Sequence, residues 1–136
     1  MKKLFSTRCS DTSFSIASFI LRVGAGSLMM INHGWDKLIH FADKANKFAD
    51  PFGIGSQASL SLTVFAEFFC AAFLILGLFT RFAVIPLIIA MGVALFYAHK
   101  GEFFGEGESA GLYLICFLAI LFFGPGKASL DKLISK

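Results

Sequence analysis

Charged residues are scarce in this sequence of 136 residues, where Asp, Glu, Lys and Arg together make up 15%. An ordinary soluble domain contains about 25% of these residues. Hydrophobic residues make up 57%, and the 18 Phe residues alone outnumber all Lys and Arg residues. A small soluble domain exposes much of its surface and needs polar residues there, which this composition does not supply. The sequence therefore predicts one domain whose solvent is largely lipid.

Motifs for several kinds of chemistry are also lacking. The three Cys residues form no C-x-x-C, and no H-x-x-x-H, E-x-x-H, flavin, nucleotide or iron–sulfur motif occurs. We therefore expect no metal site and no intrinsic cofactor. The net charge is only +3, and no basic run lies beside stacking aromatics, so nucleic acid is not an expected partner.

Four apolar segments approach the roughly 20 residues that a membrane-spanning helix needs. They are Phe14–His33, Ala58–Phe79, Phe82–Ala98 and Ala110–Gly126. We predict an all-α fold, an integral membrane four-helix up-down bundle that forms a single domain over residues 1–136. A cleaved signal peptide is the alternative for the first segment because Lys2 and Lys3 precede it. Arg22 interrupts its apolar core, however, and no A-x-A-like cleavage site follows.

The segment between the first two spans is patterned as well. Between Gly34 and Asp50, apolar residues recur at helical spacing with charged residues mostly between them. This pattern predicts an amphipathic interfacial helix, which Asp50-Pro51 would end.

The distribution of Lys and Arg predicts the orientation. The side with both tails and the 80–81 turn carries seven of these residues, and the other side carries four beside six carboxylates. Both termini are therefore predicted to be cytoplasmic, in the inner membrane of a prokaryote.

Two charged residues, Arg22 and Glu67, lie deep within predicted spans. Such groups usually face the bundle interior or water. Their backbone heights differ by roughly 6 Å, so we predict that they pair. The pair has two interpretations. It is a structural ion pair that fixes helix register, or Glu67 is a functional carboxylate that handles a proton or orients a ligand.

Further polar residues are predicted to gather above Glu67, at the outer end of the bundle. The candidate ligand-binding or proton-handling residues are Arg22, His33, Lys37, Glu67, His99 and Glu108. Two histidines at similar depth leave haem ligation open as an alternative, on weak spacing evidence. At the cytoplasmic end, Arg81 is predicted to hydrogen-bond a helix C-terminus or a lipid phosphate.

Three motifs together resemble one family. They are His33-Gly34-Trp35-Asp36-Lys37-Leu38, Glu67 followed by Gly77-Leu78-Phe79-Thr80-Arg81, and Gly124-Pro125-Gly126-Lys127-Ala128-Ser129-Leu130-Asp131. In order and spacing they resemble the DoxX family of small four-helix membrane proteins. The resemblance covers roughly residues 16–131 and implies the same four-helix fold.

The resemblance also implies a class of function. Relatives resemble the small membrane subunit of thiosulfate:quinone oxidoreductase. This implies a lipid- or quinone-binding or scaffolding subunit of a membrane-associated redox complex, and at most a subunit of a quinone-linked enzyme. Quinone is the candidate ligand. The candidate partners are membrane lipid, a soluble or membrane-bound oxidoreductase and a second copy in a homodimer. The alternatives are a structural lipid-binding protein without a redox role and a small-solute transporter.

Overall fold

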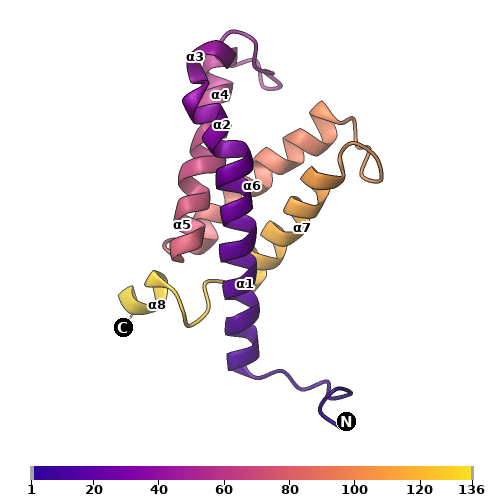
Figure 1. The fold of residues 1–136 in the computed structure, drawn as a ribbon, viewed down its shortest axis with the longest axis vertical. Helices are drawn as coiled ribbons and strands as arrows, with labels where there is room; N and C mark the ends of the chain where they lie inside the picture. The colour runs from indigo at the N-terminus through magenta and orange to yellow at the C-terminus, as the bar shows by residue number, and fades with distance from the viewer. Residues whose placement is uncertain (1, 136) are drawn as a thin grey trace.

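The computed structural model describes residues 2–135, and within that range the fold is all-helical and contains no strand. Three continuous helices are long and apolar enough to cross a membrane: Asp11–Ile39, Ser56–Leu76 and Thr80–Ala98. A fourth apolar helix, α7 (Glu108–Phe123), is shorter at 16 residues. The start of α1 (Asp11–Met29) and the short helix α8 (Leu130–Ile134) lie at one end of the molecule (Figure 1). The connection between α3 (Phe41–Lys44) and α4 (Ser56–Val64) lies at the other end.

Each of the three long helices contains a π-helical segment, in which hydrogen bonds join residues five apart and one extra residue enters the turn. The first helix consists of α1 (Asp11–Met29), η1 (Met30–Gly34) and α2 (Trp35–Ile39). The second helix consists of α4 (Ser56–Val64), η2 (Phe65–Cys70) and α5 (Ala71–Leu76). The third helix consists of α6 (Thr80–Val93) and η3 (Ala94–Ala98). Segments η1 and η2 pack against each other. Because π-helical segments are frequent at functional sites, the contact between η1 and η2 is a candidate position for one.

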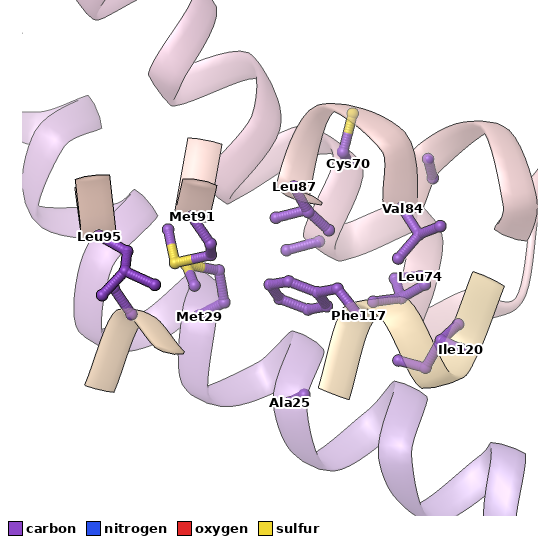
Figure 2. Packing of buried hydrophobic residues seen from close by; sticks show 13 residues of the cluster. Ala25, Met29, Cys70, Leu74, Val84, Leu87, Met91, Leu95, Phe117 and Ile120 are labelled. Carbon is purple, nitrogen blue, oxygen red and sulfur yellow. The ribbon is translucent and has the colours of Figure 1, made fainter. Parts of the chain in front are cut away.

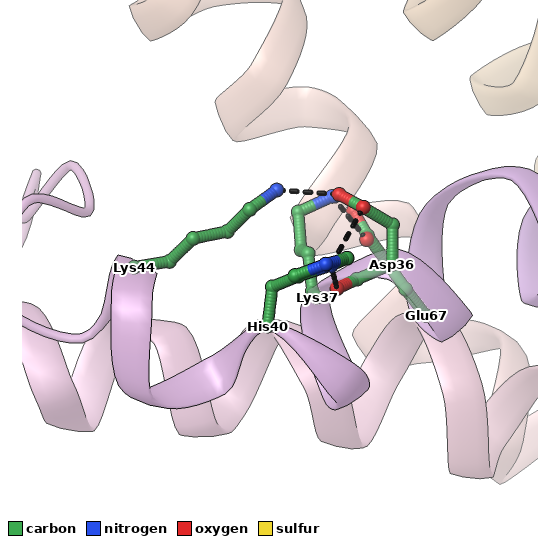
Figure 3. A network of polar contacts seen from close by, with 5 residues as sticks. All are labelled: Asp36, Lys37, His40, Lys44 and Glu67. Carbon is green, nitrogen blue, oxygen red and sulfur yellow. Dashed lines mark hydrogen bonds and ion pairs between the residues drawn. The ribbon is translucent and has the colours of Figure 1, made fainter.

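The segment 34–50, predicted as one surface helix, is divided in the structure. Residues Trp35–Ile39 prolong the first helix, so that this helix continues past its predicted end. It breaks at His40, whose backbone angles are φ −105° and ψ 25°, and only the four-residue helix α3 (Phe41–Lys44) follows. His40 and Lys44 both contact Asp36 across the break, in an exposed polar network (Figure 3).

The buried core is built from one face of each apolar helix (Figure 2). Its fully buried side chains include Met29, Leu74, Leu87 and Phe117, one from each of the four helices. The outer faces are equally apolar, and large side chains such as Phe122 are 81% exposed. A helix that is apolar on both its buried and exposed faces suits a lipid environment, because only lipid makes such exposure favourable.

The N-terminus of α6 is capped by a residue distant in sequence. The turn from α5 to α6 comprises Gly77–Phe79, slightly before the predicted turn at 80–81, and Gly77 and Phe79 both have left-handed backbone angles. The Asp131 carboxylate accepts hydrogen bonds from the Phe79 N–H at 2.7 Å and from the Thr80 N–H at 2.9 Å. A helix N-terminus leaves its first N–H groups unpaired, so this carboxylate supplies the missing acceptors.

Arg22 joins the same C-terminal segment to the helices. Its guanidinium is fully buried and donates to the carbonyls of Leu74 at 3.2 Å, Ile75 at 3.4 Å and Ala128. Ser18, one turn earlier in α1, donates to the Gly124 carbonyl at 2.6 Å. A cation beside the last carbonyls of a helix is favourable, since these carbonyls have no partner within the helix. Arg22 is therefore a structural tie between α1, the end of α5 and the segment after α7.

Replacing Asp131 with alanine is expected to lower the free energy of unfolding by about 1 kcal/mol at neutral pH, because α6 loses its cap. Burial alone would raise the pKa of the Asp131 carboxyl. The hydrogen bonds from Thr80 and Phe79 and the charge of Arg22 outweigh burial and hold that pKa below its ordinary value. The stabilisation is thus fully present above the unfolded-state pKa of about 4 and is lost as the pH falls through the lower folded-state pKa.

Denaturation in detergent micelles as a function of pH checks this expectation. Lys132→Ala is the matched control, because Lys132 is an exposed residue of the same helix, α8 (Leu130–Ile134). A stability difference between wild type and Asp131→Ala that persists unchanged at the most acidic pH would contradict the proposed role of the carboxylate.

Candidate functional site

A partly buried ion pair lies between the first and second helices. Lys37 Nζ donates to Glu67 Oε2 at 2.6 Å (Figure 3), and the Lys37 and Glu67 side chains are 18% and 6% exposed. A charge-assisted hydrogen bond of this length is among the strong ones. Each charge would be costly to bury alone in an apolar bundle, so each makes the burial of the other tolerable.

The two charges meet because the helix backbones approach closely just beside them. A Cβ on Gly34 would lie 2.5 Å from the carbonyl oxygen of Glu67 and 2.8 Å from the backbone nitrogen of Phe68, so no larger residue fits there. Gly34 ends η1, and Glu67 lies in η2. Lys37 follows Gly34 by three residues and therefore emerges on nearly the same face of the helix, within reach of the Glu67 carboxylate.

The predicted pairing of Arg22 with Glu67 is wrong. Arg22 instead donates to carbonyls at the end of α5, seven and eight residues beyond Glu67 along the second helix. At 1.5 Å per residue this places its guanidinium about 11 Å from the level of Glu67. Carbonyls at the end of α5 hold the guanidinium, while Glu67 is paired with the lysine of the prolonged first helix.

A pocket of about 420 Å³ opens beside the ion pair, between the second helix, the third helix and the connection before α4. Its walls are mainly apolar. The lining residues are Lys37, Phe48, Ala49, Pro51, Phe52, Ile54, Ser59, Leu62, Thr63, Phe65, Ala66, Glu67, Pro86, Ile89, Ala90, Val93, Ala94, Tyr97 and Ala98. Within the described chain, Lys37 and Glu67 are the only charged residues of this lining. The pocket therefore combines a long apolar surface with one ion pair.

The connection that covers the pocket is held in a defined turn by Asp50. Its carboxylate accepts from the N–H groups of Ile54 at 2.9 Å and Gly55 at 2.7 Å. Ser59 in α4 donates to the carbonyl of Ala49 at 2.7 Å and fixes the start of this connection against the second helix. The aromatic and aliphatic side chains of the connection can thus remain over the pocket without being part of a helix.

The other residues predicted for the site lie elsewhere. The ring of His33 packs edge-on against Tyr113 of α7, with centroids 5.5 Å apart, and does not line the pocket. His99 is half-buried at the end of the third helix, and Glu108 is exposed in the first turn of α7. Arg81 is exposed at the opposite end of α6, where its Nε donates to the carbonyl of Leu121 at 3.2 Å. Of the predicted cluster, only Lys37 and Glu67 reach the pocket.

Sequence reasoning missed two parts of the site. The first is the connection with Phe52 and Ile54, for which the only signal was that Asp50-Pro51 ends a helix. The second is the third-helix wall with Ala90 and Ala94, small residues that suit close helix packing and here leave room for the pocket. Within residues 2–135 no group of three or more His, Cys, Asp or Glu side chains is arranged to hold a metal ion.

Comparison with known sequences places this chain among small membrane proteins. The DoxX family profile matches residues 17–100, which include the Lys37–Glu67 pair and all of the pocket lining given above. The protein belongs to the DoxX family and, with its apolar helices, is an integral membrane protein. The Gly124–Asp131 motif lies outside the matched residues.

Two proteins of Haemophilus influenzae are similar to this chain. One is 34% identical over 111 residues, which cover 76% of this chain and 81% of that protein. The other is 28% identical over 107 residues, which cover 75% of this chain and 71% of that protein. Both are described as uncharacterized, so neither supplies an activity. No solved structure matches the chain.

Proposed function

We propose that this protein binds a membrane amphiphile in the pocket, with the headgroup at the Lys37–Glu67 pair and the tail along the apolar walls. The main observation that supports this proposal is the pocket itself, an apolar cavity of about 420 Å³ with one partly buried ion pair in its wall. Ligand sites in proteins are typically apolar clefts of this size range with a few converging polar groups. The pair orients the headgroup, and the helices exclude water from the tail.

A quinone is the ligand that we propose within this class. Its ring carries polar oxygens that can accept a hydrogen bond from Lys37, and its tail is apolar. Membership of the DoxX family supports a place in a membrane-associated redox complex. In that role the chain would be a ligand-binding or scaffolding subunit, and the electron donor would be a soluble or membrane-bound oxidoreductase partner.

The proposed function includes a placement in the membrane. We take α7 as the fourth span of an up-down bundle and the residues around α3 as the interfacial segment. Both termini are then cytoplasmic in a prokaryotic inner membrane, because Lys and Arg are more frequent on their side. A homodimer would enlarge the small protein interior that four short helices enclose.

Filling the pocket should remove the bound amphiphile without unfolding the protein. Ala90 lines the pocket from α6, and Ala90→Phe is expected to reduce occupancy at least tenfold, because its ring occupies the volume of the tail. The measurement is native mass spectrometry of gently extracted protein. Leu112→Phe is the matched control, since Leu112 is 60% exposed on α7 and does not line the pocket.

The mass of the bound molecule separates the candidate functions. A stoichiometric quinone that is lost in Ala90→Phe supports the redox role. A phospholipid in the same place supports the alternative of a structural lipid-binding protein without a redox role. Protein that carries no amphiphile, and takes none up from quinone-loaded nanodiscs, contradicts the proposal.

A further inference from the structure

We propose that the Lys37–Glu67 pair makes the pocket selective for an uncharged, hydroxyl-bearing headgroup and excludes amphiphiles with an ionised headgroup. This inference rests on the proposed function, since it concerns which amphiphile the pocket accepts. Applied to the proposed quinone, it selects the reduced, hydroxyl-bearing form, and it extends to other hydroxyl-bearing lipids such as a long-chain alcohol or a diacylglycerol.

The selectivity follows first from the balance of charges in the pocket wall. Lys37 and Glu67 carry opposite charges, and none of the other lining residues in the described chain is charged. A carboxylate or phosphate headgroup would have to draw Lys37 away and leave Glu67 unpaired among apolar side chains. An ammonium headgroup would do the same to Lys37. Removing the partner of a buried charge is strongly unfavourable, so both kinds of headgroup are rejected.

The selectivity follows second from the hydrogen-bonding capacity that Lys37 and Glu67 retain after they pair. The pair uses one N–H of Lys37 and only Oε2 of Glu67. Glu67 Oε1 forms no hydrogen bond with the described residues, and Glu67 lines the pocket, so this oxygen is the free acceptor of the pair. An ammonium group has three N–H donors, and a carboxylate only accepts. A hydroxyl can therefore donate to Glu67 and accept from Lys37 while the ion pair stays intact.

The geometry of the site supports insertion beside the pair instead of between its members. The 2.6 Å separation of Lys37 Nζ and Glu67 Oε2 leaves no room for an atom between them. The close approach at Gly34 holds the two helix backbones next to the pair, so the points from which the Lys37 and Glu67 side chains emerge are fixed relative to each other. The headgroup consequently meets a preformed dipole whose net charge is zero.

Three probes with the same hexadecyl tail test the selectivity of the wild-type protein. They are hexadecanol, hexadecanoate and hexadecyltrimethylammonium, offered in nanodiscs at alkaline pH so that the acid is ionised. Native mass spectrometry of the released protein measures occupancy. Hexadecanol is expected to bind at least about tenfold more tightly than either charged probe. Binding of a charged probe within about twofold of hexadecanol would overturn the inference but leave the proposed function standing.

A single substitution should change the selectivity in a stated direction. Glu67→Gln preserves the size of the side chain and leaves the wall with one net positive charge, so hexadecanoate is expected to gain at least about tenfold relative to hexadecanol. Asp36→Asn is the matched control. It changes the net charge equally, one residue from Lys37, but Asp36 is exposed and does not line the pocket. If hexadecanoate binding rises equally in both variants, the effect is one of general electrostatics and the inference fails.

The wild-type ranking decides the question even if Glu67→Gln does not fold. If none of the three probes binds, the inference fails, and if the pocket also stays empty in quinone-loaded nanodiscs, the proposed function has failed as well. That result is distinct from equal binding of all three probes, which rejects only the headgroup selectivity.

Discussion

Replacing Glu67 with leucine is expected to lower the free energy of unfolding by about 3 kcal/mol, because Lys37 is left in the bundle without a partner. This is the low end of the usual range, since the Lys37 side chain keeps 18% exposure and can shift toward the surface. Lys37→Met is expected to cost a similar amount, since it strands the carboxylate. The double variant should recover much of the loss, because two apolar side chains then replace two charges.

Unfolding by titration with a denaturing detergent in mixed micelles gives the three values and their coupling energy. Lys44→Met provides the control, because Lys44 also pairs with a carboxylate, that of Asp36, but on the exposed surface. Exposed ion pairs contribute about 0–1 kcal/mol, so this variant should be close to wild type. A coupling energy below about 0.5 kcal/mol between Lys37 and Glu67 would contradict the pairing.

Gly34→Ala is expected to destabilise the protein by at least about 2 kcal/mol, although it adds one methyl group. The added Cβ would meet the backbone of the second helix at 2.5 Å, and a backbone cannot move aside as a flexible side chain can. Separation of the helices would also stretch the Lys37–Glu67 bond, so the same variant should lose amphiphile binding. The measurements are the detergent titration and the occupancy of the pocket.

Gly24→Ala is a matched control within the same helix. A Cβ on Gly24 would have no atom within 4 Å, so alanine meets no obstacle there. Alanine is preferred to glycine inside a helix by roughly 0.5–1 kcal/mol, and Gly24→Ala should therefore leave the stability unchanged or raise it. If Gly34→Ala and Gly24→Ala behave alike, close approach of the helices at Gly34 is not what positions the pair.

The helical composition of this fold could be predicted from the sequence, because hydropathy alone indicates which segments can be surrounded by lipid. The ends of the helices were harder to predict. Hydropathy falls at His33, yet the helix continues to Ile39 because the polar residue Lys37 has a buried partner. A polar residue that is neutralised by tertiary contact looks, in sequence, like the end of a span.

The pairing within the site could not be predicted, for a geometric reason. A helical wheel drawn from the sequence assumes 3.6 residues per turn, but the π-helical segments η1 and η2 each place an extra residue in a turn. Side chains beyond such a segment are rotated by about 100° relative to a regular α-helix. Lys37 lies beyond η1 and Glu67 lies within η2, so a regular wheel does not describe their positions. Arg22 is held by backbone carbonyls, which every residue has, so the sequence does not indicate which of them accept its hydrogen bonds.

The tie between the C-terminal segment and the first helix has a consequence for the order of biosynthesis. Arg22 enters the membrane early, but one of its acceptors, the carbonyl of Ala128, is made more than one hundred residues later. The start of α6 likewise waits for Asp131, which follows Thr80 by 51 residues. Until Ala128 and Asp131 have been made, the nascent protein thus holds an incompletely satisfied guanidinium and an uncapped helix. The segment that carries Ala128 and Asp131 thus completes the polar contacts of Arg22 and of the start of α6 only after all four apolar helices have been made.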